Sequence, residues 1–277
     1  MSIAFQWDPR DFAHLVDSCE RDDATRYILT YMPREGLVVE AGCGLARYVE
    51  FLHRKGFRVL GIELDADTID TVKKLAPHLD VRQGDLLAMD FADGSLAGII
   101  CLGVVEHFME GPARPLRELH RVLKPGAHAV ITVPSFNLLR RIRYYLGIVN
   151  PLRIAKRSRF VRRIFGKGPL QGPVRSGCTY HPGTVPYRRR HGLPSEGFFE
   201  YLFSRGEFEG ELDRAGFIRV KSVPIGHMDG IHHDISKRMA PFRDWAFYPN
   251  RAARLLNRIL GMIPFCHNHM HLCVVRK

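Results

Sequence analysis

The stretch Val38-Val39-Glu40-Ala41-Gly42-Cys43-Gly44-Leu45-Ala46-Arg47 decides the fold of this chain. An apolar run ends there in a glycine-rich turn, and the periodic segment that follows predicts a helix. Such a turn brings bare backbone close to a ligand at the carboxyl edge of a parallel sheet. The dinucleotide-binding fingerprint has a third glycine where Arg47 stands here, so NAD and FAD are disfavoured.

Outward from this turn, short apolar runs alternate with periodic segments as far as residue 133. Apolar runs without polar alternation are typical of strands that helices cover on both faces. We expect strands in LVVEAG, RVLGIEL, LDVRQGD, AGIICLG and AHAVITV, and helices in ARYVEFLHRKG, ADTIDTVKKLA and RPLRELHRVL. Lys124-Pro125-Gly126 is expected to separate the last helix from its strand. The pattern predicts the α/β class with a Rossmann-like, doubly wound sheet.

The flanking regions extend this pattern. Helical spacing of apolar residues predicts two short helices within residues 8–32. Ser204 and Glu207 form a capping-box pattern at the start of another helix, and Gly216 stands where that helix should end. The runs FIRVKSV and HMHLCVVRK predict two further strands.

Three acidic residues follow successive predicted strands. Glu40 stands two positions before Gly42, where a carboxylate suits a positively charged ligand and repels a pyrophosphate. Glu63 lies 19 residues after Gly44, the usual distance for a side chain that binds both ribose hydroxyls. Asp85 can accept a hydrogen bond from an exocyclic amine such as that of adenine. Apolar faces for the base are expected from Leu64 and Leu86. Together they indicate a nucleoside that carries a cation and no phosphate, which is S-adenosylmethionine.

Five ordered motifs resemble those of class I S-adenosylmethionine-dependent methyltransferases, and most closely the type 11 group. The motifs are Glu40-Ala-Gly-Cys-Gly, Gly61-Ile-Glu, Gln83-Gly-Asp-Leu, Gly103-Val-Val-Glu-His-Phe and Leu123-Lys-Pro-Gly. The resemblance implies a seven-stranded sheet with an antiparallel last strand, and transfer of a methyl group from a sulfonium to a nucleophile. The family often has a further glycine at the place of Ala46.

The candidate catalytic residues are Glu106 and His107, which follow the fourth strand. A neutral imidazole could accept a hydroxyl proton near pH 7. Displacement at a sulfonium can also proceed through alignment in a dry site without a base, so a structural role for His107 stays open. The chain lacks the Asp/Asn-Pro-Pro-aromatic motif and the Pro-Cys pair of base-directed nucleic-acid methyltransferases.

The basic charge is unevenly distributed. The chain has 277 residues with 41 Lys/Arg against 29 Asp/Glu, and 16 of the basic residues and no acidic one fall between residues 119 and 195. Residues 136–168 interleave basic and apolar side chains, which predicts helices that contact an anionic membrane surface. A plain lid is an equal alternative, and nucleic-acid binding is less favoured because no aromatic stacking platform is evident. A second basic helix is expected at 250–260.

The chain is expected to divide into six parts. These are N-terminal helices packed on the core (1–35), a cofactor-binding core (36–135), a basic acceptor-covering insertion (136–203), a core helix and strand (204–224), a second cap insertion (225–266) and a final core strand (267–277). The start has no export signal and no long apolar run occurs, so a cytoplasmic location, with contact to the inner membrane face left open, is expected. Six scattered cysteines favour buried thiols over disulfides.

The run Cys266-His-Asn-His-Met-His-Leu-Cys273 invites a metal-site interpretation, because His267, His269 and His271 would share one face of a strand. The alternating residues suit a covered strand, and no metal is expected. The function predicted is S-adenosylmethionine-dependent methyl transfer to a hydroxyl or other nucleophile of a small-molecule, lipid or saccharide acceptor. An RNA-directed methyltransferase and a non-catalytic binding module remain alternatives.

Overall fold

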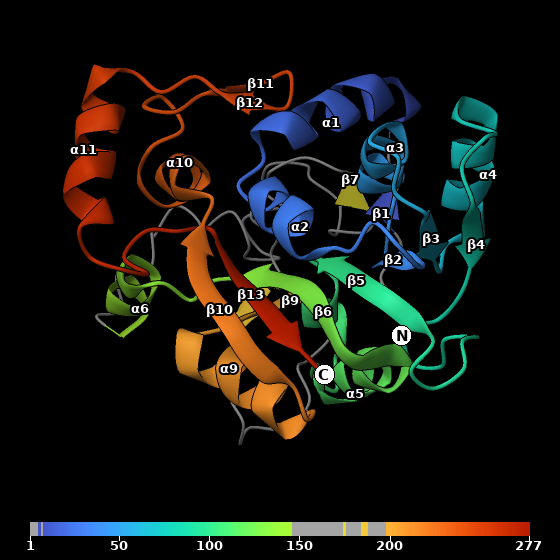
Figure 1. The fold of residues 1–277 in the computed structure, drawn as a ribbon. Helices are drawn as coiled ribbons and strands as arrows, with labels where there is room; N and C mark the ends of the chain where they lie inside the picture. Colours follow the sequence, from blue (N-terminus) through green and yellow to red (C-terminus); the bar gives the residue numbers. More distant parts are fainter. Residues whose placement is uncertain (1–4, 7, 146–173, 176–183, 188–197) are drawn as a thin grey trace, which may run out of the picture.

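The computed structural model describes residues 5–6, 8–145, 174–175, 184–187 and 198–277. At its centre lies a seven-stranded sheet (Figure 1). Its strands are β2 (Val38–Ala41), β3 (Val59–Glu63), β4 (Val81–Gln83), β5 (Leu96–Leu102), β6 (Leu123–Pro134), β10 (Ile218–Ile225) and β13 (Met270–Arg276). These are the seven strands that the apolar runs predict.

The strand order of this sheet is β10-β13-β6-β5-β2-β3-β4. Neighbours from β6 to β4 are parallel, whereas β13 is antiparallel to both β6 and β10. The doubly wound α/β class and the antiparallel last strand are therefore confirmed. The order reverses between β2 and β5, and ligands of open α/β sheets bind beside such a reversal at the carboxyl ends of the strands.

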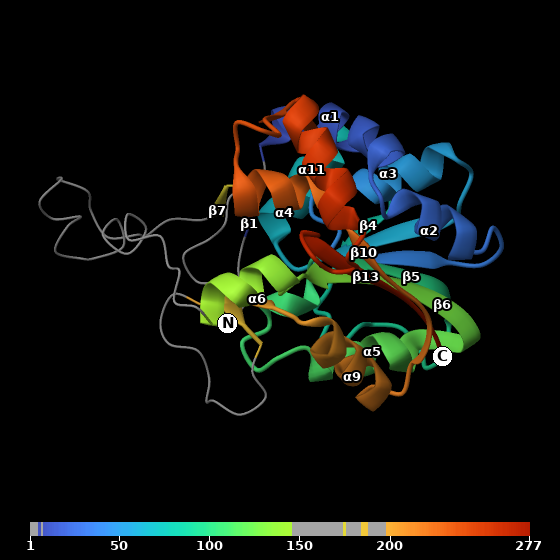
Figure 2. The same cartoon turned by 90° about the vertical axis from the view of Figure 1, so that its left-hand side faces the viewer.

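Helices cover both faces of the sheet and produce two separate cores (Figures 1 and 2). One face carries α1 (Phe12–Ser18), α2 (Thr25–Tyr31), α3 (Arg47–Arg54) and α4 (Ala66–Leu75). The other carries α5 (Ala113–Val122) and α9 (Arg205–Arg214). Successive strand residues point to opposite faces, so Val274 joins the first core and Val275 the second. This is why the strands read as continuous apolar runs.

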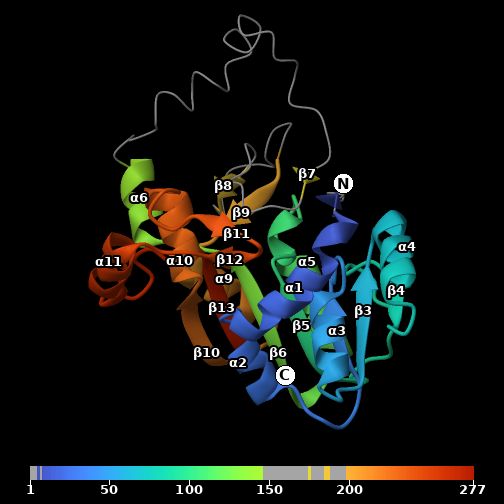
Figure 3. The same ribbon diagram turned by 90° about the horizontal axis from the view of Figure 1, so that it is seen from above.

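The remaining elements surround the carboxyl edge of the sheet or connect the layers. They are η1 (Pro9–Asp11), η2 (Cys19–Arg21), η3 (Val105–His107), α6 (Leu138–Tyr145), α10 (His227–Gly230), the π-helical turn η4 (Ile231–Ile235) and α11 (Arg251–Gly261). Three short pairs join β1 (Phe5–Gln6) to β7 (Val174–Arg175), β8 (Thr184–Pro186) to β9 (Glu200–Leu202), and β11 (Phe242–Arg243) to β12 (Ala246–Phe247). Figure 3 shows α6, α10 and α11 at the β10 end of the sheet.

The structure describes four parts of the predicted basic insertion 136–203, which are residues 136–145, 174–175, 184–187 and 198–203. Helix α6 forms its start, and most of the segment 136–168 lies outside the described residues. The second basic helix is present as α11. Among the residues that the structure describes, no helix combines the length and apolar character needed to cross a bilayer.

Two local predictions have different outcomes. The capping box is confirmed, because the Ser204 backbone N–H donates to Glu207 Oε2 at 2.9 Å and the Ser204 side chain caps the helix. The separating turn at 124–126 is wrong: α5 ends at Val122 and β6 begins at Leu123. The register between β5 and β6 shifts there, so Pro125 and Gly126 form a bulge inside the strand. A bulge tolerates proline because no ladder hydrogen bond is required of it.

Candidate functional site

One cavity of about 1160 Å³ opens at the carboxyl ends of the parallel strands. All nine residues predicted from the sequence for cofactor binding or chemistry line it: Glu40, Gly42, Gly44, Glu63, Leu64, Asp85, Leu86, Glu106 and His107. The cap elements α10, η4, β11, β12 and α11 contribute further lining residues. The fold therefore gathers residues from Leu15 to Met270 onto one surface.

The glycine loop between β2 and α3 is packed too tightly for side chains. Gly42 has a φ of +77°, and a Cβ there would lie 2.6 Å from a methyl group of Val104. Gly44 donates its N–H to Glu63 Oε2 at 2.9 Å. Ala46 adopts the left-handed conformation, with a φ of +58°, at the place where the family often has glycine. The loop thus depends on glycine at its first position for space and backbone geometry.

Glu40 also has a structural role, which its position in the motif does not predict. Ala46 precedes α3 and has no side chain that can cap the helix. The buried Glu40 carboxylate supplies the missing acceptor, because Val49 donates its backbone N–H to Glu40 Oε2 at 3.1 Å. Burial raises the pKa of Glu40 to about 8. The group lies at the positive end of the α3 dipole and on the cavity wall at once.

Glu63 and Asp85 are held by backbone amides at the ends of neighbouring strands. Glu63 accepts hydrogen bonds from the backbone N–H groups of Gly44, Leu64 and Asp65 at 2.8 to 3.1 Å. Asp85 accepts one from Leu87 at 2.8 Å. These bonds fix the orientation of both carboxylates while leaving acceptor capacity toward the cavity.

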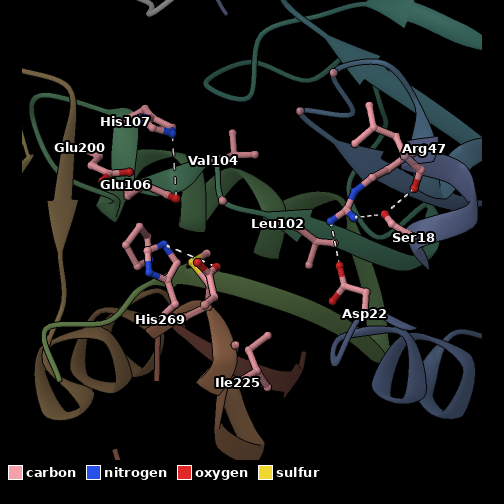
Figure 4. Close-up of a pocket in the computed structure, with 18 of the residues that line it drawn as sticks. Ser18, Asp22, Arg47, Leu102, Val104, Glu106, His107, Glu200, Ile225 and His269 are labelled. Atoms are coloured by element: carbon pink, nitrogen blue, oxygen red, sulfur yellow. Dashed lines mark hydrogen bonds and ion pairs between the residues drawn. The ribbon is translucent and has the colours of Figure 1, made fainter. Parts of the chain in front are cut away.

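A cationic side chain, labelled in Figure 4, directly follows the glycine loop. Arg47, the first residue of α3, forms an ion pair with Asp22 at 2.9 Å and a hydrogen bond with Ser18 at 3.4 Å. All three residues line the cavity. Arg47, which stands where the dinucleotide-binding fingerprint has its third glycine, therefore links the N-terminal helices to the glycine loop.

A cluster of polar side chains occupies a different part of the wall, where η3 meets β9. Glu106 Oε1 lies 4.0 Å from His107 Nε2, and the His107 Nδ1 atom lies 2.8 Å from the carbonyl oxygen of Phe199. Burial raises the pKa of Glu106 well above its usual value, and the neighbouring Glu200 raises it further. Burial also raises the pKa of Glu200 to about 7. The buried carboxyl groups of Glu106 and Glu200 and the imidazole of His107 thus lie close together on one part of the cavity wall.

A second cluster lies next to the first on the same side of the cavity and includes His269, which Figure 4 labels. Asp229 Oδ1 lies 3.1 Å from His233 Nε2, and Asp229 Oδ2 lies 3.9 Å from His269 Nε2. Arg140 donates from Nη2 to His269 Nδ1 at 2.7 Å and pairs with Asp234 at 2.8 Å.

The expected face of three histidines is wrong. Strand β13 begins only at Met270, so His267 and His269 precede it. His267 contacts Asn257 at 2.8 Å and His271 contacts Ser222 at 2.9 Å, in separate surroundings. Burial lowers the pKa of each of these three imidazoles to about 4. The cysteine prediction holds for the described part of the chain, where five of the six are buried and free.

Sequence reasoning missed several residues that line the cavity. Glu200 belongs to no motif, and the packing of β9 against η3 brings it beside Glu106. Asp229 and His233 are four residues apart, a helical spacing that could have been noticed. Arg140 appeared only as one of many basic residues in the insertion.

Comparison with known proteins bears directly on this region. Residues 39–131 match the model of the type 11 methyltransferase family, described as a methyltransferase domain. These residues form a class I methyltransferase domain of type 11. The match includes the glycine loop, the three acidic strand ends and Glu106-His107. The cofactor of this domain family is S-adenosylmethionine.

Relatives of the methyltransferase domain are found among curated proteins and solved structures. A Mycolicibacterium smegmatis protein named "Probable S-adenosylmethionine-dependent methyltransferase" is 30% identical over 42% of this chain and 42% of its own. Demethylmenaquinone methyltransferase of Chlorobaculum parvum is 33% identical over 28% of this chain and 32% of its own. An S-adenosylmethionine-dependent methyltransferase of Archaeoglobus fulgidus aligns over 95% of this chain and 94% of its own, with a TM-score of 0.54 and 15% identity.

The sequence matches and the structural match cover different shares of this chain. The matches with the two curated proteins span less than half of the length of each and less than half of this chain. The structural match covers nearly the whole chain but shows the fold alone at this identity.

Proposed function

We propose that this protein transfers the methyl group of S-adenosylmethionine to a nucleophilic atom of an acceptor bound in the same cavity. The observation that carries the proposal is the meeting of Glu40, Glu63 and Asp85 around one cavity, at the ends of three adjacent strands. Its volume of about 1160 Å³ exceeds the roughly 300 to 1000 Å³ of common ligand pockets, which leaves room for an acceptor beside the cofactor.

The proposed cofactor contacts follow from the chemistry of each group. Glu63, fixed by three backbone amides, receives the ribose hydroxyls. Asp85 accepts the adenine amine, with Leu64 and Leu86 at the faces of the ring. Glu40 lies on the side of the glycine loop where the positive part of the cofactor would approach. When bound, the sulfonium supplies the methyl group, and this chain contributes alignment and exclusion of water.

The acceptor side of the cavity is the wall formed by the clusters around Glu106 and His269. We propose a hydroxyl or other nucleophile of a small molecule, lipid or saccharide as the acceptor, with Glu106 and His107 as the polar groups that face it. Nine acidic residues line the cavity against three arginines, of which Arg47 and Arg140 are ion-paired. A neutral or cationic acceptor group suits this wall better than a polyanion such as RNA.

Calorimetry with S-adenosylmethionine and with its demethylated product tests the proposal. Asp85→Ala and Glu63→Ala should each weaken binding by about 1 to 3 kcal/mol, because a buried ligand donor loses its acceptor. The control is Asp80→Ala, since Asp80 pairs with Arg82 on the surface outside the cavity. A wild-type chain that binds neither compound would identify a non-catalytic module, and unchanged affinity in both variants would refute the assigned contacts.

We also propose contact with an anionic membrane surface, supported by one observation on α11. This helix and the turn after it expose four large apolar side chains, Leu255 (61%), Ile259 (48%), Met262 (75%) and Ile263 (51%). The helix contains no acidic residue, and it exposes Arg251, Arg254 and Arg258. Apolar side chains among arginines suit the headgroup region of an anionic leaflet.

A further inference from the structure

Three side chains that no cofactor contact uses converge on one point of the cavity wall. Glu106 and His107 come from η3, and Glu200 comes from β9. One ligand atom from each, two carboxylate oxygens and an imidazole nitrogen, lies within 4.8 Å of the others. Small rotations of the side chains would bring all three to the bond lengths of about 2.0 to 2.2 Å that a divalent metal ion requires.

The tautomer of His107 suits a metal ligand. Its Nδ1 atom lies 2.8 Å from the carbonyl oxygen of Phe199, which can only accept a hydrogen bond. In the neutral imidazole Nδ1 therefore carries the proton, and the lone pair is on Nε2, the atom nearer to Glu106. Metal-bound histidines commonly donate their other N–H to a backbone carbonyl in this way.

The carboxylates need a positive partner. Glu106 is 1% exposed, and its Oε2 atom has no hydrogen-bond donor among the described residues. Glu200 accepts a hydrogen bond from Thr184 at 3.0 Å. Arg140 attracts Glu200, but its guanidinium donates to Asp234, Ser135 and His269. Burying an ionised carboxylate without a donor or cation is costly, so a buried carboxyl group keeps its proton unless a cation takes the place of that proton.

We propose that Glu106, His107 and Glu200 bind a divalent transition-metal ion on the acceptor side of the cavity. One imidazole and two carboxylates suit Mn²⁺, Fe²⁺ or Zn²⁺. Three protein ligands leave coordination positions toward the cavity, where an oxygen of the acceptor can be held. The ion would position and polarise that oxygen beside the methyl donor.

The neighbouring cluster of Asp229, His233 and His269 does not meet the same conditions. The Arg140 guanidinium donates to His269 Nδ1, so in the neutral imidazole the proton is on Nε2, the atom nearer to Asp229. That nitrogen has no lone pair for a metal, and the adjacent guanidinium charge repels a cation. His269 is therefore a matched control for His107.

Titration of the full chain with MnCl₂ in the absence of S-adenosylmethionine tests the inference. Calorimetry should show one Mn²⁺ site per chain, and pulsed electron paramagnetic resonance should show coupling to one imidazole nitrogen. Loss of outer-shell partners alone weakens metal sites about 10 to 100-fold. Glu106→Gln and Glu200→Gln should therefore weaken binding at least about tenfold.

Variants of the two histidines show whether His107 or His269 binds the metal ion. His107→Gln should abolish the nitrogen coupling, and His269→Gln should leave both affinity and coupling unchanged. Circular dichroism confirms that each variant is folded, and Glu200→Gln serves if Glu106→Gln does not fold. Absence of saturable Mn²⁺ and Zn²⁺ binding, equal affinity in the Glu106 and Glu200 variants, or loss of binding in His269→Gln would each overturn the inference. The titration contains no methyl donor, so its failure is distinct from failure of the proposed function.

Discussion

Glu40 illustrates how one side chain can serve the fold and the cavity together. Its carboxylate accepts the Val49 N–H at the start of α3, where Ala46 offers no side-chain cap. It also lines the cavity beside the glycine loop. A residue that a motif marks as a ligand contact is thus also part of a helix terminus.

The buried Glu40 carboxyl group gives a pH dependence whose sign can be worked out. Burial raises its pKa from 4.5 to about 8, so between these values the folded chain keeps a proton that the unfolded chain releases. This contribution to stability is complete below about pH 4.5 and is lost as the pH rises toward 8. Glu40→Gln should remove it, which makes the loss of unfolding free energy between pH 5.5 and 7.5 smaller by about 2 to 3 kcal/mol.

Urea unfolding of both proteins at the two pH values measures this difference. Glu35→Gln is a suitable control, because Glu35 is exposed on the loop before β2 and should leave the pH dependence unchanged. The assignment fails if Glu40→Gln and the wild-type chain lose the same free energy over this interval.

At the scale of an element, α9 depends on its N-terminus. The helix packs on the sheet through Phe208 and Leu212, which are fully buried. The side chain of Ser204 and that of Glu207 satisfy backbone N–H groups reciprocally at its first turn. The hydrogen bonds of the capping box and the packing of the helix on the core therefore both favour a start of α9 at Arg205.

Ser204→Ala should lower the free energy of unfolding by about 1 kcal/mol, because a backbone donor at the start of α9 loses its acceptor. Equilibrium urea unfolding measures the change, and Ser204→Asp, which can still accept that bond, should retain most of the stability. An alanine variant as stable as the wild-type chain would show that water satisfies the donor equally well.

At the scale of the whole molecule, acidic and basic residues lie in different places. Acidic residues gather on the cavity wall, whereas α11 exposes three arginines. Most basic residues of the segment 136–168 lie outside the described residues. The long-range field of such a chain attracts anionic surfaces even though its cavity is acidic.

The membrane proposal predicts binding to phosphatidylglycerol vesicles that weakens with salt and is absent with phosphatidylcholine. Leu255→Asp with Ile259→Asp should greatly reduce co-sedimentation, because both exposed apolar side chains would otherwise enter the headgroup region. Leu75→Asp is the matched control, since Leu75 is 40% exposed but lies on α4. Equal binding of all variants, or binding to RNA in place of vesicles, would contradict the proposal.

The sequence predicted the architecture well because the relevant signals are local. Apolar runs, the glycine turn and the capping box each depend on a few neighbouring residues, and the seven strands follow from them. The separating turn at 124–126 was wrong because a bulge and a loop have the same proline-glycine composition. The histidine face was wrong because the boundary of β13 depends on its pairing with β6 and β10.

By itself the sequence determined the α/β sheet, the glycine loop and the three acidic strand ends, since parallel strands bring their carboxyl ends to one edge. Only the tertiary structure decided that Glu40 caps α3, that Glu200 lies beside Glu106, and that Arg140 faces His269. Those relations join residues up to 129 positions apart, and their geometry depends on packing between elements that no local pattern encodes.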